Sequence, residues 1–171
     1  MKTTFVALAA LMISGAAFAQ SSEIGMNGVS LRLGMVFPLD NTLSSVNDNF
    51  SNLALEFQIP SSIAKGTESY LAIDYFSKNI GLFGKGSVVP VTYNVRVMQK
   101  SGTTRQTYAY GGLGVAFFDM TGPSQTVICA RGGFGMNTGE HIFIEAGGTF
   151  SAKTNSQGSF NTIGISVGYR F

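Results

Sequence analysis

The sequence has one cysteine, one histidine and no tryptophan, and only 12% of its residues are charged. Soluble domains carry about 25% charged residues, so this composition is unusual for a domain surrounded by water. The lone Cys129 excludes an internal disulfide and lacks neighbouring ligands for a metal or redox centre, so we interpret it as a small buried side chain. Because 11 basic residues nearly balance 9 acidic ones, a basic surface for nucleic acid is excluded as well.

The first 19 residues have the features of a cleavable signal peptide. Lys2 is the only charge in this segment, an apolar stretch runs from Phe5 to Ile13, and small residues lead to Ala17-Phe18-Ala19, an A-x-A cleavage pattern. An uncleaved membrane helix is the alternative, but the small residues suit a peptidase better than a lipid anchor. We expect residues 1–19 to be removed and residues 20–171 to form one exported domain.

Beyond this segment the chain lacks long apolar runs, although its mean hydropathy is positive. A membrane helix needs about 18 consecutive apolar residues, and no such run follows residue 20. The apolar residues instead alternate with small or polar ones, which is the period of an extended strand. Between Asn161 and Phe171, the odd-numbered residues from Ile163 onward are apolar or aromatic. The even-numbered residues are small or polar and include Arg170.

Similar alternation recurs along the chain, separated by segments rich in Gly, Pro, Asn and Ser. The expected strands are Gly28–Phe37, Asn52–Ile59, Ser69–Ser77, Ser87–Gln99, Gln106–Phe118, Gln125–Met136, His141–Phe150 and Asn161–Phe171. Their even number and their lengths suit tilted membrane-spanning strands. The sequence therefore predicts an all-β fold, an eight-stranded antiparallel up-and-down transmembrane β-barrel with both termini in the periplasm.

The side chains on the face of each strand opposite the apolar side chains distinguish a membrane barrel from a soluble barrel. We call these side chains the opposite row. It carries one charge on each of seven expected strands, and its other members are mostly glycine and alanine. A water-facing row has no reason to be rich in glycine, whereas the interior of a narrow barrel leaves little room for side chains. Charges sealed there must pair. The predicted interior network consists of Arg32, Glu56, Asp74, Arg96, Arg131, Glu145 and Arg170.

Aromatic residues raise two further questions. The fifth strand has no charge, and parity would turn Tyr108 and Tyr110 inward as donors to the carboxylates. A bulge at Gly111-Gly112 would instead turn both outward, and the sequence leaves these alternatives open. Other aromatics are expected to face outward near strand ends, at the two membrane surfaces. These are Phe37, Tyr75, Tyr93, Phe150, Tyr169 and Phe171.

Two segments, YAYGGLGVA from Tyr108 and ISVGYRF from Ile165, resemble the small outer-membrane β-barrel family that includes OmpX and the OmpA membrane domain. The similarity of pattern extends over most of residues 24 to 171. It implies a monomer in the outer membrane of a Gram-negative-type bacterium, in contact with outer-membrane lipids and lipopolysaccharide. Tyr169 and Phe171 resemble the C-terminal signal that the barrel-assembly machinery reads.

A lipid-acting enzyme is the alternative, because such enzymes also occur on eight-stranded barrels. Lipid A deacylases carry a His-x-Ser pair, but His141 is followed by Ile142-Phe143. Parity places His141 inward, where Thr138, Thr149 or Ser166 would become partners only through an accident of the fold. A general porin is excluded because eight strands enclose side chains rather than water. We expect a non-enzymatic protein without cofactor or metal, with a structural or surface-contact role.

Overall fold

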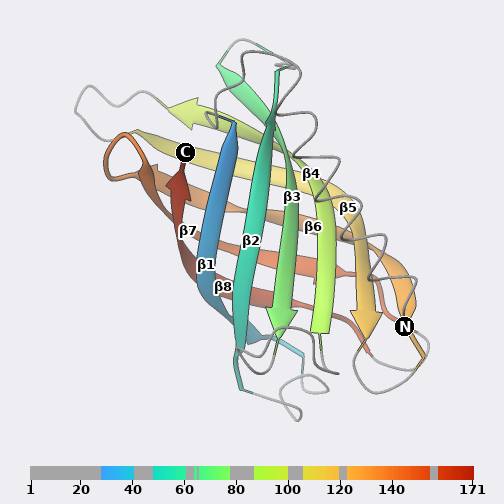
Figure 1. The fold of residues 1–171 in the computed structure, drawn as a ribbon. Helices are drawn as coiled ribbons and strands as arrows, with labels where there is room; N and C mark the ends of the chain where they lie inside the picture. The colour runs from blue at the N-terminus through green and yellow to red at the C-terminus, as the bar shows by residue number, and fades with distance from the viewer. Residues whose placement is uncertain are drawn as a thin grey trace.

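The computed structural model describes residues 28–40, 48–60, 64, 66–77, 87–99, 106–119, 123–154 and 158–171. Eight strands build this part of the chain (Figure 1). They are β1 (Val29–Pro38), β2 (Phe50–Ile59), β3 (Thr67–Ser77), β4 (Ser87–Gln99), β5 (Thr107–Asp119), β6 (Gln125–Asn137), β7 (Ile142–Ser151) and β8 (Thr162–Arg170). The predicted signal peptide, with Ala17 and Ala19, lies outside the described residues.

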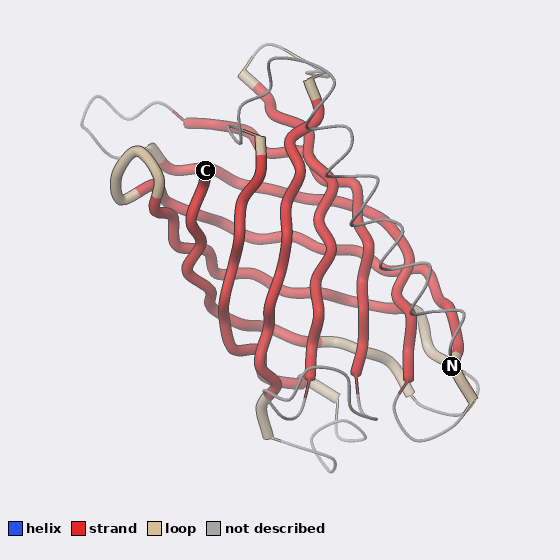
Figure 2. Tube along the Cα trace, viewed as in Figure 1, coloured by secondary structure: helices blue, strands red, loops and turns tan. Residues whose placement is uncertain are grey.

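The strands form a closed barrel. Each pairs antiparallel with the next along the chain, and β8 pairs with β1 from Ser30–Arg170 to Pro38–Thr162. The strands of the front wall cross those of the rear wall obliquely (Figures 1 and 2), as the tilt of strands in a closed barrel requires. Closure leaves no unpaired sheet edge. The predicted all-β, eight-stranded antiparallel fold is confirmed.

The predicted strand ends agree with the observed ones to within two residues, and β4 has the predicted bounds. The largest differences are the starts of β2 and β3, where pairing extends to Phe50 and Thr67. The outward residues at these ends are the polar Ser51 and Thr67. The apolar alternation therefore stops before the ladder of backbone hydrogen bonds does.

The outward face of the barrel is apolar along the strands. Leu113, Ile128 and Phe134 are 69%, 71% and 73% exposed, although such side chains are usually buried in soluble proteins. An apolar outer band is the pattern of a transmembrane barrel. Large outward hydrophobic residues include Leu33, Met35, Phe37, Leu53, Tyr93, Val97, Leu113, Val115, Phe117, Ile128, Phe134, Ile142, Ile144, Phe150, Ile163, Ile165, Val167 and Tyr169.

The outward aromatic residues only partly follow the predicted arrangement at strand ends. Phe37, Phe150 and Tyr169 are each the last residue but one of their strands. Tyr93 faces outward as expected, but it lies midway between Ser87 and Gln99, so its placement near a strand end was wrong. Alternation with a period of two predicts whether a side chain faces into or out of the barrel. It does not predict how far along the strand, and hence at what depth in the membrane, the residue lies.

One end of the interior is filled with apolar side chains, which the sequence interpretation missed because it emphasised the small inward residues. Phe50, Phe76 and Phe118 point inward from strand ends and are at most 2% exposed. Cys129 lies among them as a free, buried thiol, as predicted. We call this group the phenylalanine plug; it consists of Val36, Phe50, Phe76, Val88, Ala116, Phe118, Cys129 and Phe160.

Phe160 enters the plug from the connection between β7 and β8. Its ring centroid lies 4.9 Å from that of Phe76 and 6.1 Å from that of Phe50, and the side chain has no exposed surface. The Phe160 backbone N–H donates to Ser151 Oγ at 2.7 Å. The carbonyl oxygen of Asn161, the next residue, accepts a 2.7 Å hydrogen bond from Leu39 N–H. The connection is thus tied to the barrel mouth, and the ring closes it.

We predict that Phe160→Ala lowers the free energy of unfolding by about 3–5 kcal/mol, because it leaves a cavity among rings that cannot collapse into it. Phe150→Ala, at an outward position that is 46% exposed, is the matched control and should cost much less. Urea unfolding in detergent micelles, followed by circular dichroism, measures both. Equal losses would show that Phe160 is not a packed part of the interior.

Candidate functional site: the charged interior of the barrel

Six charged side chains meet inside the barrel, each from a different strand. All are at most 5% exposed, and three guanidinium groups balance three carboxylates. Burying an ion without a partner costs several kcal/mol, so this balance is a condition for the fold. We call these residues the charge cluster; they are Arg32, Glu56, Asp74, Arg96, Arg131 and Glu145.

Arg32 is the centre of the charge cluster. Its Nη2 lies 2.5 Å from Asp74 Oδ1, and its Nη1 lies 3.1 Å from Glu145 Oε2. Its Nε is 3.3 Å from Glu56 Oε1, close enough for an ion pair but without hydrogen-bond geometry. One guanidinium group thereby connects β1 with β2, β3 and β7. The fork of donors on arginine suits this role, which a lysine could not fill.

The other two arginines extend these contacts around the interior. Arg131 Nη2 donates to Glu145 Oε2 at 2.8 Å, and Arg96 Nη2 donates to Glu56 Oε2 at 3.0 Å. Arg96 also approaches Glu145 at 3.6 Å. Each carboxylate therefore serves more than one arginine. Such a network is rigid because moving one member breaks several charge-assisted contacts.

Tyrosines line the charge cluster, which decides between the two alternatives for β5. Tyr108 and Tyr110 face inward and are buried, because β5 pairs without a bulge from Thr107 to Asp119. Tyr108 OH donates to Glu145 Oε1 at 2.9 Å. The Arg96 guanidinium carbon lies 4.5 Å from the Tyr70 ring centroid and 4.6 Å from that of Tyr108. Cation–π contacts of this kind stabilise a desolvated guanidinium group.

Glycines on the inward row make room for these rings. A Cβ atom added to Gly135 would collide with the ring of Tyr108, its cross-strand partner. A Cβ atom added to Gly168 would likewise meet the ring of Phe143, which it faces across β7 and β8. The glycine-rich parity thus reflects competition for interior space, as expected from the sequence.

Arg170 and Glu68 depart from the prediction. Arg170 faces inward but is half-buried, and among the described residues it forms no ion pair; its guanidinium carbon lies 5.4 Å from the Phe143 ring centroid. Glu145 pairs with Arg131 and not with Arg170. The sequence interpretation also missed Glu68, a second charge on β3, whose carboxylate lies 3.6 Å from Arg96. Its parity, shared with Asp74, could have revealed it, but the expected strand began one residue later.

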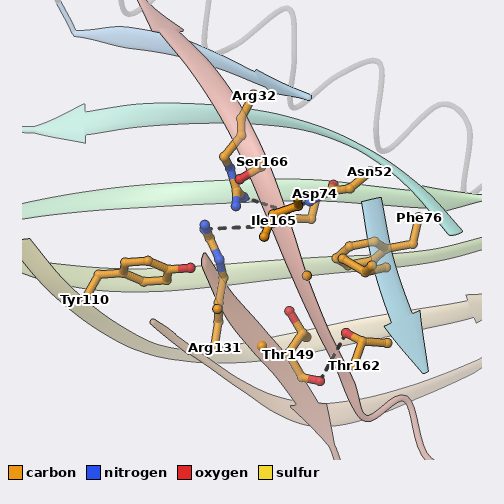
Figure 3. Close-up of a pocket in the computed structure, with 14 residues that line it drawn as sticks. Arg32, Asn52, Asp74, Phe76, Tyr110, Arg131, Thr149, Thr162, Ile165 and Ser166 are labelled. Carbon is orange, nitrogen blue, oxygen red and sulfur yellow. Dashed lines mark hydrogen bonds and ion pairs between the residues drawn. The ribbon is translucent and has the colours of Figure 1, made fainter. Parts of the chain in front are cut away.

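A small polar cavity separates the charge cluster from the phenylalanine plug (Figure 3). In this view Arg32 and Arg131 point toward Asp74 from opposite sides, and Phe76 marks the side of the plug. Asn52 Nδ2 donates to Asp74 Oδ1 at 3.2 Å. The hydroxyl-bearing residues of the lining are Tyr110, Thr149, Thr162 and Ser166.

His141 lies outside this interior, contrary to the inward position that parity predicted. β7 begins only at Ile142, so His141 belongs to the preceding turn and is exposed. Its ring stacks on the outward Tyr169, with centroids 5.4 Å apart. Of its suggested partners, Thr149 and Ser166 are buried inside the barrel, and Thr138 Oγ1 donates to the Ile142 carbonyl at 3.2 Å. Among the described residues, no hydroxyl is hydrogen-bonded to this imidazole, whose Nδ1 lies 2.8 Å from the Arg170 carbonyl oxygen.

Other site types receive no support from the described residues. They contain no group of three or more His, Cys, Asp or Glu side chains able to hold a metal ion. No helix among them is long and apolar enough to cross a membrane.

Tyr169 and Phe171, proposed as an assembly signal, lie on the outer surface and meet edge to face at 5.2 Å. Chemically, the ion pairs of the charge cluster join opposite walls of the barrel.

The chain matches no family model and no curated protein sequence. Solved structures do match. The outer membrane enzyme PagL has a TM-score of 0.54 at 11% identity, covering 82% of this chain and 97% of PagL. The N-terminal β-barrel domain of Pseudomonas aeruginosa OprF has a TM-score of 0.52 at 12% identity, covering 85% and 98%. Neisserial surface protein A has a TM-score of 0.50 at 9% identity, covering 84% and 94%.

These likenesses concern the path of the backbone. The chain has the fold of the small eight-stranded outer-membrane β-barrels, which confirms the resemblance drawn from the sequence. PagL is an enzyme, so the fold by itself does not assign or exclude an activity.

We predict that Glu145→Ala destabilises the barrel by about 3–5 kcal/mol, because it leaves three buried arginines to share only the carboxylates of Glu56 and Asp74. Glu140→Ala, in the exposed turn before β7, is the control and should be nearly neutral. Because tryptophan is absent, circular dichroism in urea is the measurement. Unchanged stability of the Glu145 variant would show that the charge cluster does not hold the barrel together.

Proposed function

We propose that this chain is a non-enzymatic integral protein of the outer membrane of a Gram-negative-type bacterium, with a structural or surface-contact role. The observation that carries the proposal is the reversed distribution of side chains. Apolar residues cover the outside of the strands, while ion pairs fill the inside. In water this arrangement would expose a large apolar surface. In a bilayer it satisfies both faces.

The closed interior supports a structural role over transport. The phenylalanine plug occupies one end, and the charge cluster fills the middle with side chains that already have partners. Eight strands enclose a lumen that side chains can fill, and we infer that the described interior does not conduct bulk water or solutes. We infer that contacts with other molecules are made by the connections and the outer surface.

Topology and biogenesis follow from the same proposal. β1 begins and β8 ends at the same end of the barrel, and we place this end in the periplasm. Residues 1–19 would be removed after Ala19 during export, and Tyr169 with Phe171 would be read by the barrel-assembly machinery. The protein would remain a monomer surrounded by phospholipid and lipopolysaccharide.

We predict that Val95→Arg, at an outward position in the interior of β4, destabilises the protein by about 2–4 kcal/mol in a bilayer. Val95→Leu is the matched control and should be tolerated. Folding into lipid vesicles and migration of boiled and unboiled samples on a detergent gel measure the effect. Equal tolerance of Arg and Leu, or identical migration of boiled and unboiled parent protein, would contradict a lipid-facing position.

A second test addresses catalysis directly. We expect purified protein to leave lipopolysaccharide and phospholipid unchanged, as judged by mass spectrometry of the lipids after incubation. The reason is that, among the described residues, His141 is hydrogen-bonded to the Arg170 carbonyl rather than to a hydroxyl, and Thr138 Oγ1 donates to the Ile142 carbonyl. Loss of one acyl chain that disappears in His141→Ala would overturn the proposal in favour of a lipid-modifying enzyme.

A further inference from the structure

The small polar cavity beside Asp74 lies between the charge cluster and the phenylalanine plug (Figure 3). Its polar walls include Asn52, Asp74 and Arg131, whereas Phe76 lines it from the plug. The volume of the cavity is about 20 Å³. One buried water molecule requires roughly 10–15 Å³, so the space suits a single water molecule and is too small for an organic ligand.

Three buried polar atoms of the lining residues form no hydrogen bond within the described part of the chain. They are Asp74 Oδ2, Asn52 Oδ1 and Arg131 Nη1, and their side chains belong to residues that are at most 5% exposed. Arg131 Nη1 lies 3.7 Å from Asp74 Oδ2, which is close enough for an ion pair but too long for a direct hydrogen bond. Buried polar atoms in native proteins are almost always hydrogen-bonded, so all three require a partner.

The chemistry of these three atoms determines what that partner is. Asn52 Nδ2 donates to Asp74 Oδ1 at 3.2 Å, which identifies Asn52 Oδ1 as the carbonyl oxygen that accepts from another donor. Asp74 Oδ2 also accepts, whereas Arg131 Nη1 only donates. The partner must therefore donate two hydrogen bonds and accept one. A metal cation cannot accept from Arg131, and a halide ion cannot donate to Asp74, but a water molecule does both.

We propose that this cavity is the binding site of one water molecule that is a fixed part of the interior. The water accepts from Arg131 Nη1 and donates to Asp74 Oδ2 and Asn52 Oδ1. The 3.7 Å contact between Arg131 and Asp74 thereby becomes a water-bridged ion pair, which connects β6 with β3 and β2. The site lies inside the barrel, so it does not depend on what surrounds the outer surface or on the proposed function.

Two measurements on the purified, folded protein test the site. A crystal structure at high resolution should show one water peak at about 2.7–3.2 Å from each of the three atoms. Oxygen-17 magnetic relaxation dispersion in detergent micelles counts long-lived internal water molecules. Ser166 lines the cavity, and Ser166→Val, with its larger apolar side chain, should lose one such water relative to the parent. Ser166→Ala leaves the space open, so this matched control should keep the water.

Each other outcome counts against the proposal. A crystal structure of the parent without a water peak between the three atoms would overturn the site, as would a metal or halide ion at that position. An unchanged number of long-lived waters in folded Ser166→Val would also overturn it. Loss of the water in both variants would show that it depends on the Ser166 hydroxyl rather than on Asn52, Asp74 and Arg131. Heat-dependent migration on a detergent gel verifies that each variant is folded, and the crystal structure decides the site without any variant.

Discussion

The ion pairs of Arg32 are the interaction on which the rest of the structure depends. Asp74, Glu145 and Glu56 surround this guanidinium group at 2.5, 3.1 and 3.3 Å. They belong to β3, β7 and β2, so one side chain joins neighbouring strands to the opposite wall. In a low-dielectric interior none of these charges can be left alone, because desolvation would cost more than the fold can supply. Only a closed barrel with this register brings all of them within reach.

The other interior residues either leave space for this charge cluster or close the barrel at one end of it. Tyr70 and Tyr108 flank Arg96, while glycines such as Gly135 leave space for the rings. Beyond the small cavity beside Asp74, the phenylalanine plug closes one mouth, with Phe160 contributed by a connection rather than a strand. Side chains of the described residues thus fill the interior from the charge cluster to the phenylalanine plug. This filling is the basis on which we propose a structural role rather than transport.

The proposed surface-contact role places function on surfaces that face lipid or water. The strands present a nearly uninterrupted apolar belt, and the turn before β7 places His141 at its border, stacked on Tyr169. His141 is exposed on the outside, whereas the hydroxyl residues Thr149 and Ser166 are buried inside the barrel. Similar folds include both a surface protein and an enzyme.

The sequence alone determined the strand number, the facing of each strand and the residues of the charge cluster, because side chains in a strand alternate with a period of two whatever the strand pairs with. It also predicted the free, buried Cys129 and left Tyr108 and Tyr110 undecided, since a bulge changes parity without changing composition. Tertiary structure decided what depends on closure and depth. Closure made Arg32, Arg96 and Arg131, and not Arg170, the partners of Glu145, because the stagger between strands sets which inward residues share a level. Closure also placed Phe160 in the barrel mouth and His141 on the outside, where the chain has left the strand and the period of two no longer applies.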